Sequence, residues 1–456
     1  MKVDVIVVGS GQAGVPLATR LARAGKRVLL AERGDLGGTC TNTGCTPTKT
    51  MMASARAAHV ARASGRLGVR TGEVQVDLAA VVDRKDAIVR RWREGVEQHL
   101  RDAGERLTVL RGHARFTGER RLEIAGQTHT ADTVVVNVGA RPIKPRIEGL
   151  DGIPWLDNRT VMQLRTTPSH LLVLGGSYVG CEFGQMFRRF GAQVTIVDTA
   201  PHLMAREDPE VSSALESAFR AEGIGLELGT GAEKASGTEG GIVLRLANGK
   251  ELRGSHLLVA VGRRPNSDDL GCEAAGIALD DKGFIVADDE YRTTAPGTFA
   301  VGDAIAQPQF THVAWDDHRI LFDVLLGRPH RGRKERHFPY TAFTDPQVAG
   351  VGLTEREARD RGVAYEAATM PFGDIARAIE IDETAGILKV LVDPKTERIL
   401  GAAIVGAEAG ELIHVFVALM QAGGSARAVV DAQAVHPTFS EGVQSVLMKL
   451  PRYALT

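Results

Sequence analysis

The alternation of apolar runs and a glycine turn at the start of the chain predicts a strand, a helix and a second strand. Residues 3–8 form a short, apolar, β-branched run, and a helical pattern begins at the glycine turn that follows. That pattern stops at Gly25, and a second apolar run at residues 27–31 ends at Glu32. We therefore predict a βαβ unit with a glycine-rich turn after its first strand.

The turn has the spacing Gly-x-Gly-x-x-Gly, formed by Gly9, Gly11 and Gly14. Glycines at these positions let the backbone approach a pyrophosphate at the helix N-terminus, and the Glu32 carboxylate can accept hydrogen bonds from a ribose. A single turn of this kind is a weak signal, because glycine-rich turns also join strands to helices in proteins that bind no nucleotide.

The same pattern recurs in the middle of the chain, which strengthens the interpretation. Its parts are an apolar run at 171–174, a glycine turn at 175–180, a helix to about Phe190, an apolar run at 194–197 and an acid at Asp198. Gly9 precedes Glu32 by 23 positions, and Gly175 precedes Asp198 by the same number. Ser177 replaces the usual middle glycine and is small enough to admit a pyrophosphate. We therefore predict two dinucleotide sites in one α/β chain.

The second acidic residue also predicts which nicotinamide cofactor binds. A carboxylate at Asp198 would repel a 2′-phosphate, and residues 199–205 contain no Arg or Lys that could receive one. We therefore expect NADH to be favoured over NADPH. His202 and Arg206 are the nearby basic residues that could weaken this preference.

Cys40 and Cys45 are separated by four residues, so their sulfurs can close one short disulfide loop. A structural crosslink would gain little there, because closing so short a loop removes little entropy from the unfolded chain. A dithiol in such a loop can instead open, exchange and close again. Thr46 as N-cap and Pro47 as first helical residue would begin a helix just after Cys45, whose N-terminal positive charge favours a thiolate. The alternative is a pair of buried, unreactive cysteines.

The composition fits an intracellular redox enzyme. Four cysteines occur in 456 residues, and Cys181 and Cys272 lie far from the pair in apolar contexts. The 55 Lys and Arg residues nearly balance the 56 Asp and Glu residues, so no strong field indicates nucleic acid or an anionic membrane as partner. No apolar run approaches a membrane span, and Asp4 interrupts any secretory signal. We expect a cytoplasmic protein of about three domains.

On these motifs the chain resembles the flavoprotein disulfide reductases, a class I oxidoreductase family that includes dihydrolipoyl dehydrogenase, glutathione reductase and mercuric reductase. The resemblance implies an α/β fold with two Rossmann-like domains, which bind FAD and NAD, and a C-terminal α+β dimerisation domain. It assigns residues 1–150 and 266–337 to the FAD-binding domain, 151–265 to the NAD(P)-binding domain and 338–456 to the interface domain.

Further segments resemble landmarks of that family. Residues 112–114 are similar to the strand that passes the adenine, and residues 136–142 and 259–265 are similar to the crossings between the FAD and NAD domains. Residues 298–303 are similar to the second FAD signature, and residues 343–354 are similar to the first strand of the interface domain. In the signature, an apolar strand delivers Asp303 to the ribityl chain, although this residue could also be an ordinary turn residue. The first crossing departs from the family pattern, with Asn137 and Val138 where Ala and Thr are usual.

The resemblance also implies roles for the residues around the cysteine pair. Cys45 would face the flavin, Cys40 would exchange with substrate, and Lys49 would lie near the flavin and pair with Glu182. By position alone, Lys49 and Glu182 could instead be solvated charges on two helices. The cofactor-binding residues implied for FAD and NADH are Gly9, Gly11, Gly14, Glu32, Thr39, Lys49, Ala114, Gly139, Gly175, Tyr178, Val179, Gly180, Asp198, Gly262 and Asp303.

The motif from His436 to Glu441 supplies a candidate acid–base group. An imidazole whose orientation a carboxylate holds can give a proton to a thiol, or take one from it, near neutral pH. Taken alone, His436 could be an ordinary loop histidine. In the family that the chain resembles, this His-Pro-Thr-x-x-Glu motif enters the active site of the partner subunit. The resemblance therefore implies a homodimer with shared active sites and a cis His436–Pro437 bond.

The presence of both His436 and Glu441 favours a disulfide or dithiol substrate, so we interpret the chain as an NADH-dependent disulfide reductase similar to dihydrolipoyl dehydrogenase. Mercuric reductases carry an additional C-terminal cysteine pair, whereas the last cysteine here is Cys272. A metal-ion or quinone reductase is the alternative interpretation, and a flavin-bearing redox sensor without turnover is a third. We expect no bound metal, and neither nucleic acid nor membrane as a partner.

Overall fold

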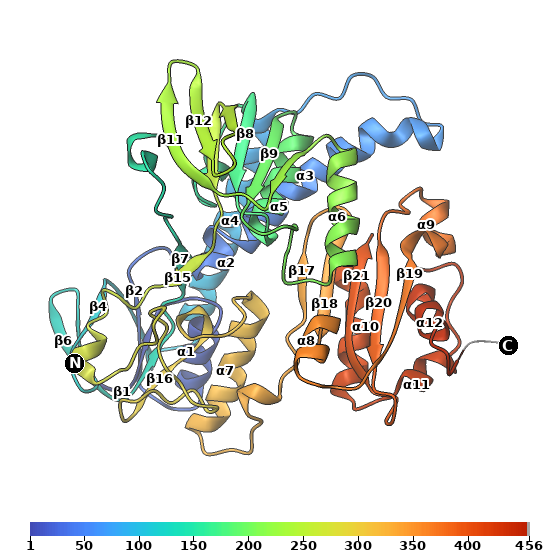
Figure 1. Cartoon of the computed structure of the whole chain (residues 1–456). Helices are drawn as coiled ribbons and strands as arrows, with labels where there is room; N and C mark the ends of the chain where they lie inside the picture. The colour runs from blue at the N-terminus through green and yellow to red at the C-terminus, as the bar shows by residue number, and fades with distance from the viewer. Residues whose placement is uncertain (454–456) are drawn as a thin grey trace. The chain divides into compact units, whose positions relative to one another are not determined.

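The computed structural model describes residues 1–453, which separate into two compact units (Figure 1). Unit 1 consists of residues 1–50, 80–143 and 262–336. Unit 2 consists of residues 51–79, 144–261 and the described residues from 337 onward. Each unit is therefore built from segments that are far apart in the sequence.

Unit 1 contains a mixed sheet with the strand order β3-β2-β1-β6-β5-β4, in which β16 also pairs with β6. The strands are β1 Lys2–Val8, β2 Val28–Glu32, β3 Leu107–Arg111, β4 Ala114–Gly118, β5 Arg121–Ile124, β6 Gln127–Val136 and β16 Thr298–Ala300. β1 runs parallel to β2 and β6, whereas β4, β5 and β6 are antiparallel neighbours. The apolar run of β1 lies in the middle of the sheet, where strands are covered on both faces.

Helix α1 Gly14–Arg23 connects β1 to the parallel strand β2, so the first predicted βαβ unit is confirmed. This helix buries Leu17, Ala18 and Leu21, and it lies beside α7 Thr311–Leu325 (Figure 1). The other helices with residues in unit 1 are α2 Gly38–Asn42, α3 Cys45–Ala63 and α4 Leu78–Arg101. A separate antiparallel pair is formed by β7 Ala140–Pro142 and β15 Arg263–Pro265.

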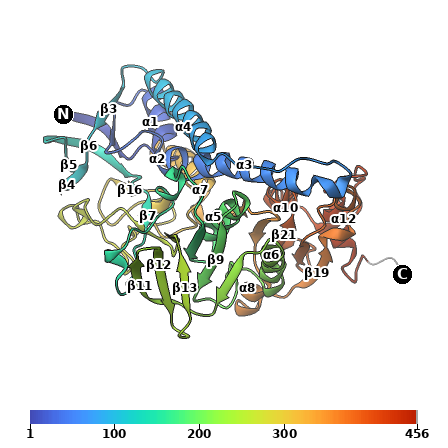
Figure 2. The same ribbon diagram turned by 90° about the horizontal axis from the view of Figure 1, so that it is seen from above.

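Unit 2 contains the second βαβ unit in a parallel sheet with the order β10-β9-β8-β14. The elements are β8 His170–Leu174, α5 Tyr178–Arg189, β9 Gln193–Asp198, α6 Pro209–Ala221, β10 Gly225–Leu228 and β14 His256–Val259. An antiparallel sheet of β11 Ala232–Thr238, β12 Gly241–Leu246 and β13 Glu251–Gly254 has its strands side by side (Figure 2). The second predicted βαβ unit is confirmed, and its helix ends at Arg189, next to the predicted Phe190.

The C-terminal part of unit 2 is an antiparallel sheet with the order β17-β18-β21-β20-β19. Its strands are β17 Tyr340–Ala342, β18 Gln347–Gly352, β19 Glu366–Pro371, β20 Ile387–Val392 and β21 Ile399–Gly406. The helices are α8 Glu355–Asp360, α9 Ala376–Glu380, α10 Ala409–Gln421, α11 Ala426–Val430 and α12 Glu441–Met448. α10 packs on β18 and β21, and α12 packs on β19 and β20 (Figure 1).

The prediction of one opening strand at residues 343–354 was wrong in its bounds. The sheet opens instead with β17, and the chain turns at residues 343–346 before β18 begins. Pro346 lies in that turn, where its missing N–H costs the sheet no hydrogen bond. Short 3₁₀ helices also connect elements, at Ser64–Leu67, Leu150–Gly152, Val161–Gln163, Cys272–Ala275, Gly302–Ala304, Arg333–Glu335 and Phe372–Asp374.

One face of α5 holds the turn between β17 and β18. Glu182, Gln185 and Arg189 follow helical spacing, so their side chains leave the helix on the same side. Glu182 Oε1 accepts a hydrogen bond from the Phe343 backbone N at 2.8 Å, and Gln185 Oε1 accepts one from the Asp345 backbone N at 2.8 Å. Helix α5 and the turn that leads into β18 of the C-terminal sheet are therefore joined by hydrogen bonds from backbone N–H groups to side chains.

Asp345 is the anionic centre of this contact. Its Oδ2 lies 2.7 Å from Arg189 Nη1 and also pairs with Arg56 of α3, while Glu222 binds Arg189 at 2.7 Å. Burial raises the pKa of Asp345, but the two arginines more than offset this and hold the pKa below its ordinary value. Asp345 therefore stabilises the folded state above the ordinary aspartate pKa of 3.8, and this contribution is lost as the pH falls.

We predict that Asp345→Asn lowers the free energy of unfolding at pH 7 by about 1–3 kcal/mol, because hydrogen bonds between charged groups are lost. Denaturant titrations at pH 7 and pH 3 should show a smaller gap between variant and wild type at the lower pH. The matched control is Asp374→Asn, which removes an exposed ion pair with Lys449 and should cost less than about 0.5 kcal/mol. Equal stability of Asp345→Asn and wild type at pH 7 would contradict the prediction.

Candidate active site

The two cysteines are carried by consecutive helices of unit 1. Cys40 lies in α2, Cys45 is the first residue of α3, and both are free thiols. The predicted helix start, with Thr46 as N-cap and Pro47 as the first helical residue, was therefore wrong by two residues, because Cys45 itself begins the helix. Thr43 and Gly44 join the two helices, and a Cβ on Gly44 would lie 2.9 Å from the carbonyl oxygen of Thr39.

The two sulfurs hold their protons unequally. The pKa of the Cys40 thiol is raised, first because it hydrogen-bonds to Cys45 and then because it is buried. A hydrogen bond from Thr311 and the charge of Lys49 oppose this rise. Cys45 instead occupies the N-terminus of α3, where the partial positive charge of the helix favours a thiolate. The arrangement therefore favours a proton on Cys40 and a negative charge on Cys45.

Thr311 completes the cysteine site, and sequence reasoning missed it. It is the first residue of α7, and its Oγ1 lies 3.1 Å from Cys45 Sγ. A hydroxyl in this position can donate a hydrogen bond to a thiolate, and such charge-assisted bonds are stronger than neutral ones. No local motif marks this threonine, which is 266 positions away from Cys45 in the chain.

The first glycine turn has no room for side chains. A Cβ on Gly9 would lie 2.2 Å from the carbonyl oxygen of Asn137, and one on Gly14 would lie 2.0 Å from the carbonyl oxygen of Gly9. The Glu32 carboxylate closes the turn, because its Oε2 accepts hydrogen bonds from Ser10 N at 2.8 Å and from Ser10 Oγ at 2.7 Å. Close packing of the backbone thus explains why these positions are glycine, and the Glu32 carboxylate fixes the turn through its hydrogen bonds to Ser10.

The second glycine turn is built in the same way. A Cβ on Gly180 would lie 1.7 Å from the carbonyl oxygen of Gly175. The Asp198 carboxylate accepts hydrogen bonds from Gly176 N and, at 2.8 Å, from Ala200 N. The two copies therefore share the spacing in the sequence and also the hydrogen bond from a backbone N–H of the turn to the acid.

Asn137 connects two segments that the resemblance assigns to FAD. It is 7% exposed, and its Nδ2 donates a hydrogen bond to the carbonyl oxygen of Gly9 at 3.2 Å. A Cβ on Gly302 would lie 3.0 Å from Asn137 Oδ1. The residue that departs from the family pattern thus packs between the first glycine turn and the segment that carries Asp303. Sequence analysis assigned no role to its side chain.

Asp303 faces an arginine of the second domain crossing. Its Oδ2 lies 3.3 Å from Arg263 Nη1, and Arg263 Nη2 also donates to the carbonyl oxygen of Ala140 at 2.8 Å. Burial raises the pKa of Asp303, and the Arg263 charge opposes this rise. Gly139 and Gly262 precede the paired strands β7 and β15 and have φ angles of 67° and 127°, which favour glycine.

The structure places the remaining site residues of the sequence analysis on regular elements. They are Thr39 in α2, Lys49 in α3, Ala114 at the start of β4, Gly11 in the first turn, Tyr178 and Val179 at the start of α5, and Glu182 within α5. Lys49 belongs to unit 1, where its charge acts on Cys40. Glu182 belongs to unit 2 and is 5% exposed, with Phe343 N as one hydrogen-bond donor.

His436 and Glu441 form a hydrogen-bonded pair in unit 2. Nδ1 of His436 lies 2.9 Å from Glu441 Oε1, and Glu441 Oε2 accepts a hydrogen bond from Thr438 N at 2.9 Å. The Thr438 N–H and then His436 hold the pKa of Glu441 below its ordinary value. The His436–Pro437 bond is cis, as predicted. With Nδ1 engaged by the carboxylate, the exposed imidazole is oriented to exchange a proton through Nε2.

A cluster of carboxylates also occurs in unit 2. Within the described part of the chain, Asp208, Glu210 and Glu355 bring their oxygens close enough together to ligate a cation. The Lys389 ammonium lies among them, 2.9 Å from Asp208 and 2.6 Å from Glu355. The Lys389 ammonium therefore offsets part of the negative charge of the cluster. Among residues 1–453, no helix has the length and apolar character that a membrane crossing requires.

Comparison with known proteins gives the same picture as this geometry. Residues 3–317 match the model of the pyridine nucleotide-disulphide oxidoreductases, and residues 338–447 match the dimerisation domain of that family. A dihydrolipoyl dehydrogenase of Thermus scotoductus is 33% identical over 462 residues, which cover 99% of this chain and 98% of the relative. A mercuric reductase of Staphylococcus aureus is 31% identical, over 97% of this chain and 81% of the relative.

A solved structure is similar over nearly the whole chain. It is the Cu(II) complex of the HOCl-induced flavoprotein disulfide reductase RclA from Escherichia coli, with a TM-score of 0.90 and 32% identity over 98% of this chain and 99% of the other. The chain therefore belongs to the class I pyridine nucleotide-disulfide oxidoreductases, and it is an FAD-dependent enzyme that uses a pyridine nucleotide.

Proposed function

We propose that the enzyme is an NADH-dependent disulfide reductase, in which the Cys40–Cys45 pair transfers two electrons to a disulfide or dithiol-type substrate. The observation that carries this proposal is the hydrogen-bonded thiol pair, with Cys45 at a helix N-terminus and Thr311 at 3.1 Å from its sulfur. Such a pair can cycle between dithiol and disulfide without rearranging the fold.

The exchange proceeds in two displacements whose atoms and electrons balance. A thiolate on Cys40 attacks one sulfur of the substrate disulfide, forms a mixed disulfide and displaces the first substrate thiolate. The Cys45 thiolate then attacks the Cys40 sulfur, which forms the Cys40–Cys45 disulfide and releases the second substrate thiolate. The protein sulfur pair is oxidised by two electrons and the substrate disulfide is reduced by two. The proton of Cys40 passes to one product thiolate, and water supplies the proton that the other takes up.

The raised pKa of Cys40 creates a need for a base. Cys40 must lose its proton before it can attack, and each departing thiolate must gain one. We assign both transfers to His436, whose ring Glu441 holds at 2.9 Å. The dimerisation domain supports a homodimer. By resemblance, His436 acts on the cysteine pair of the partner subunit, so the two active sites of the dimer are shared.

The chain's own residues fit the FAD that the family uses. We propose that residues 1–150 and 266–337 form its domain, with the Gly9–Gly14 turn at the pyrophosphate, and that Asn137 keeps this turn aligned with Asp303. Lys49 and Glu182 are proposed to pair beside it. When bound there, FAD supplies two-electron chemistry between the nicotinamide and the sulfur pair.

The second βαβ unit is proposed as the NADH site, within residues 151–265. Asp198 places a carboxylate at the end of β9, and its oxygens already hold Gly176 N and Ala200 N. A second carboxylate supports the preference for NADH, because Glu216 Oε1 lies 3.2 Å from His202 Nδ1 and engages one of the nearby basic residues. The carboxylates of Asp198 and Glu216 therefore both oppose binding of a 2′-phosphate after β9.

Reduction of a metal ion is the second candidate function. Two thiols within hydrogen-bonding distance of one another are ligands that soft metal ions prefer, and two of the relatives are named for mercury reduction and for a Cu(II) complex. NADH oxidation should be compared with lipoamide, glutathione disulfide, a quinone, Hg(II) and Cu(II) as acceptors. A redox sensor without turnover would leave all five unreduced, although a sensor has no need of the His436–Glu441 pair.

The roles of the two sulfurs can be separated by trapping. In the FAD-loaded Cys45→Ser variant, glutathione disulfide should leave a stable mixed disulfide on Cys40, because no second thiol can release it. The Cys40→Ser variant should accumulate much less adduct, and both variants should lose disulfide turnover. Mass spectrometry of the modified peptides measures the site. An adduct on Cys45 but none on Cys40 would reverse the assignment.

Cofactor preference tests the assignment of Asp198. The wild type should have the higher kcat/KM with NADH, since the carboxylate repels a 2′-phosphate. The double variant Asp198→Asn/Thr199→Arg keeps an acceptor for the turn, removes the negative charge and adds a positive one. The NADH/NADPH ratio of kcat/KM should fall by roughly tenfold or more, since like-charge contacts cost several kcal/mol. Each single variant serves as control, and a wild type that prefers NADPH would refute the assignment.

Loss of the base should affect one half of the reaction. His436→Ala should reduce disulfide turnover by about 10²–10⁴-fold, while reduction of the enzyme by NADH stays largely intact. Mixed dimers of inactive His436→Ala and inactive Cys45→Ser chains should regain activity, because one of their two sites receives intact groups from both subunits. Mixed dimers that stay inactive despite proven subunit exchange would rule out shared sites.

A further inference from the structure

The loop from residue 199 to residue 208, which follows the acid of the second βαβ unit, is held at both of its ends. At the first end, Asp198 binds Gly176 N, and Met204 N donates a hydrogen bond to the carbonyl oxygen of Gly176 at 2.8 Å. Met204 has a φ angle of 48°, which a side chain of this kind rarely adopts. The loop is thus folded back onto the second glycine turn.

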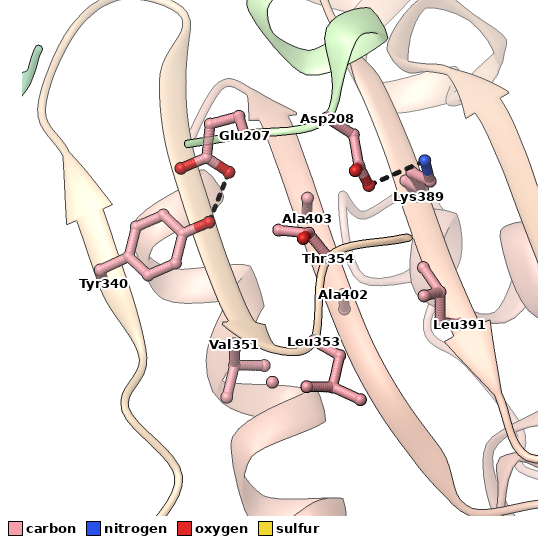
Figure 3. Close-up of a pocket in the computed structure, with 11 residues that line it drawn as sticks. Glu207, Asp208, Tyr340, Val351, Leu353, Thr354, Lys389, Leu391, Ala402 and Ala403 are labelled. Atoms are coloured by element: carbon pink, nitrogen blue, oxygen red, sulfur yellow. Dashed lines mark hydrogen bonds and ion pairs between the residues drawn. The ribbon is translucent and has the colours of Figure 1, made fainter. Parts of the chain in front are cut away.

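At its other end, the loop is fixed to the C-terminal sheet by a buried carboxylate. Glu207 is 4% exposed, and its Oε2 accepts a hydrogen bond from the Tyr340 hydroxyl at 2.5 Å. Figure 3 shows the two groups facing each other, with the Asp208–Lys389 ion pair farther along the sheet, where Lys389 lies on β20 beyond β21. Glu207 N also donates to the carbonyl oxygen of Met204 at 2.8 Å, so a short path connects Tyr340 to the glycine turn.

The sheet makes room for the Tyr340 side chain. Tyr340 on β17 pairs in register with Gly350 on β18, and a Cβ on Gly350 would lie 2.3 Å from the Tyr340 hydroxyl oxygen. The absence of a side chain at this position lets the phenol lie across β18 and reach Glu207. Replacement of Gly350 by a larger residue would displace the phenol and break the contact.

The same phenol ring also contacts the helix that begins at the nucleotide turn. The ring centroids of Tyr340 and Tyr178 are 6.0 Å apart with an interplanar angle of 58°, a favourable tilted arrangement. Tyr178 is the first residue of α5 and directly follows Ser177 of the glycine turn. Tyr340 therefore touches the proposed nucleotide site in two ways, through the ring of Tyr178 and through Glu207.

We propose that Tyr340 and Glu207 are positioning residues for the pyridine nucleotide: together they hold Tyr178 and the loop 199–206 in the arrangement that receives NADH. This inference rests on the proposed function of the second βαβ unit. It makes nucleotide affinity depend on a residue of the C-terminal sheet that lies 142 positions after Asp198 in the chain. FAD content and the chemistry of the cysteine pair do not depend on this contact.

A carboxylate at position 207 does more than fill space. A buried carboxylate is costly, and an amide or an apolar side chain would occupy the same volume without a charge. Burial raises the pKa of Glu207 to about 7, with Asp208 and Glu357 adding to the rise and the Tyr340 hydrogen bond and Arg356 opposing it. The contact with Tyr340 therefore changes character near neutral pH, from an ionised acceptor above that pH to a protonated carboxyl below it.

The first test is Tyr340→Phe in the FAD-loaded enzyme. Its NADH dissociation constant, measured by equilibrium titration, should rise about fivefold, the lower end of typical coupling between two sites. KM for NADH should rise with it, whereas kcat with saturating NADH and FAD content should stay within about twofold of wild type. The matched control is Tyr453→Phe, which removes the same kind of hydrogen bond, from a hydroxyl to Glu397 at 2.8 Å, and should leave NADH affinity unchanged.

The second test uses pH and distinguishes positioning from packing. NADH affinity of the wild type should fall as the pH decreases through about 7, because Glu207 gains a proton. Glu207→Gln should remove this dependence, and Tyr340→Phe should weaken it strongly, because the contact that changes with protonation of Glu207 is absent from that variant. A packing role alone would leave the pH dependence of NADH affinity unchanged in Tyr340→Phe.

The outcomes separate this inference from the function on which it rests. Unchanged NADH affinity and an unchanged pH dependence of that affinity in Tyr340→Phe would overturn the inference, while the Asp198 variants would still test the nucleotide site. If Tyr340→Phe fails to fold, Glu207→Gln decides by the same two measurements. A wild type whose NADH binding is insensitive to Asp198 would overturn the proposed site and this inference together.

Discussion

The structure depends on one constraint that occurs twice: a strand, a turn and a helix packed so closely that the turn admits no side chain. A Cβ on Gly14 or on Gly180 would lie within 2.0 Å of a carbonyl oxygen. In each copy, the acid at the end of the next strand then binds a backbone N–H of the turn, as Glu32 does for Ser10 and Asp198 for Gly176. In both copies the turn leads into the N-terminus of a helix, a position whose backbone N–H groups and dipole favour an anion.

Each copy is extended by contacts that come from distant parts of the chain. In unit 1, Asn137 lies between the first glycine turn and Gly302, and Thr311 lies beside Cys45. The groups proposed to bind FAD and the reactive sulfur are thus set by the same packed core. The group beside the Cys45 sulfur, Thr311, belongs to helix α7 and not to the short segment that carries the cysteines. A regular element positions such a group more precisely than a loop does.

In unit 2, helix α5 joins nucleotide binding to the C-terminal sheet. The ring of its first residue, Tyr178, lies tilted against that of Tyr340, and Arg189 at its opposite end binds Asp345. Residues 338–447, which include this sheet, match the dimerisation domain of the family.

The sequence by itself determined both βαβ units and their acids, because each depends on local spacing and periodicity. The Cys40–Cys45 pair was predicted from its spacing as well, whereas the His436–Glu441 pair was predicted through the resemblance to a family. It misplaced the start of α3 and the first strand of the C-terminal sheet, where the boundary depends on packing against other elements. The tertiary structure alone decided that Thr311 faces Cys45 and that Tyr340 binds Glu207. These partners are 266 and 133 positions apart, and no local pattern in a single chain encodes a contact that exists only after distant segments have packed together.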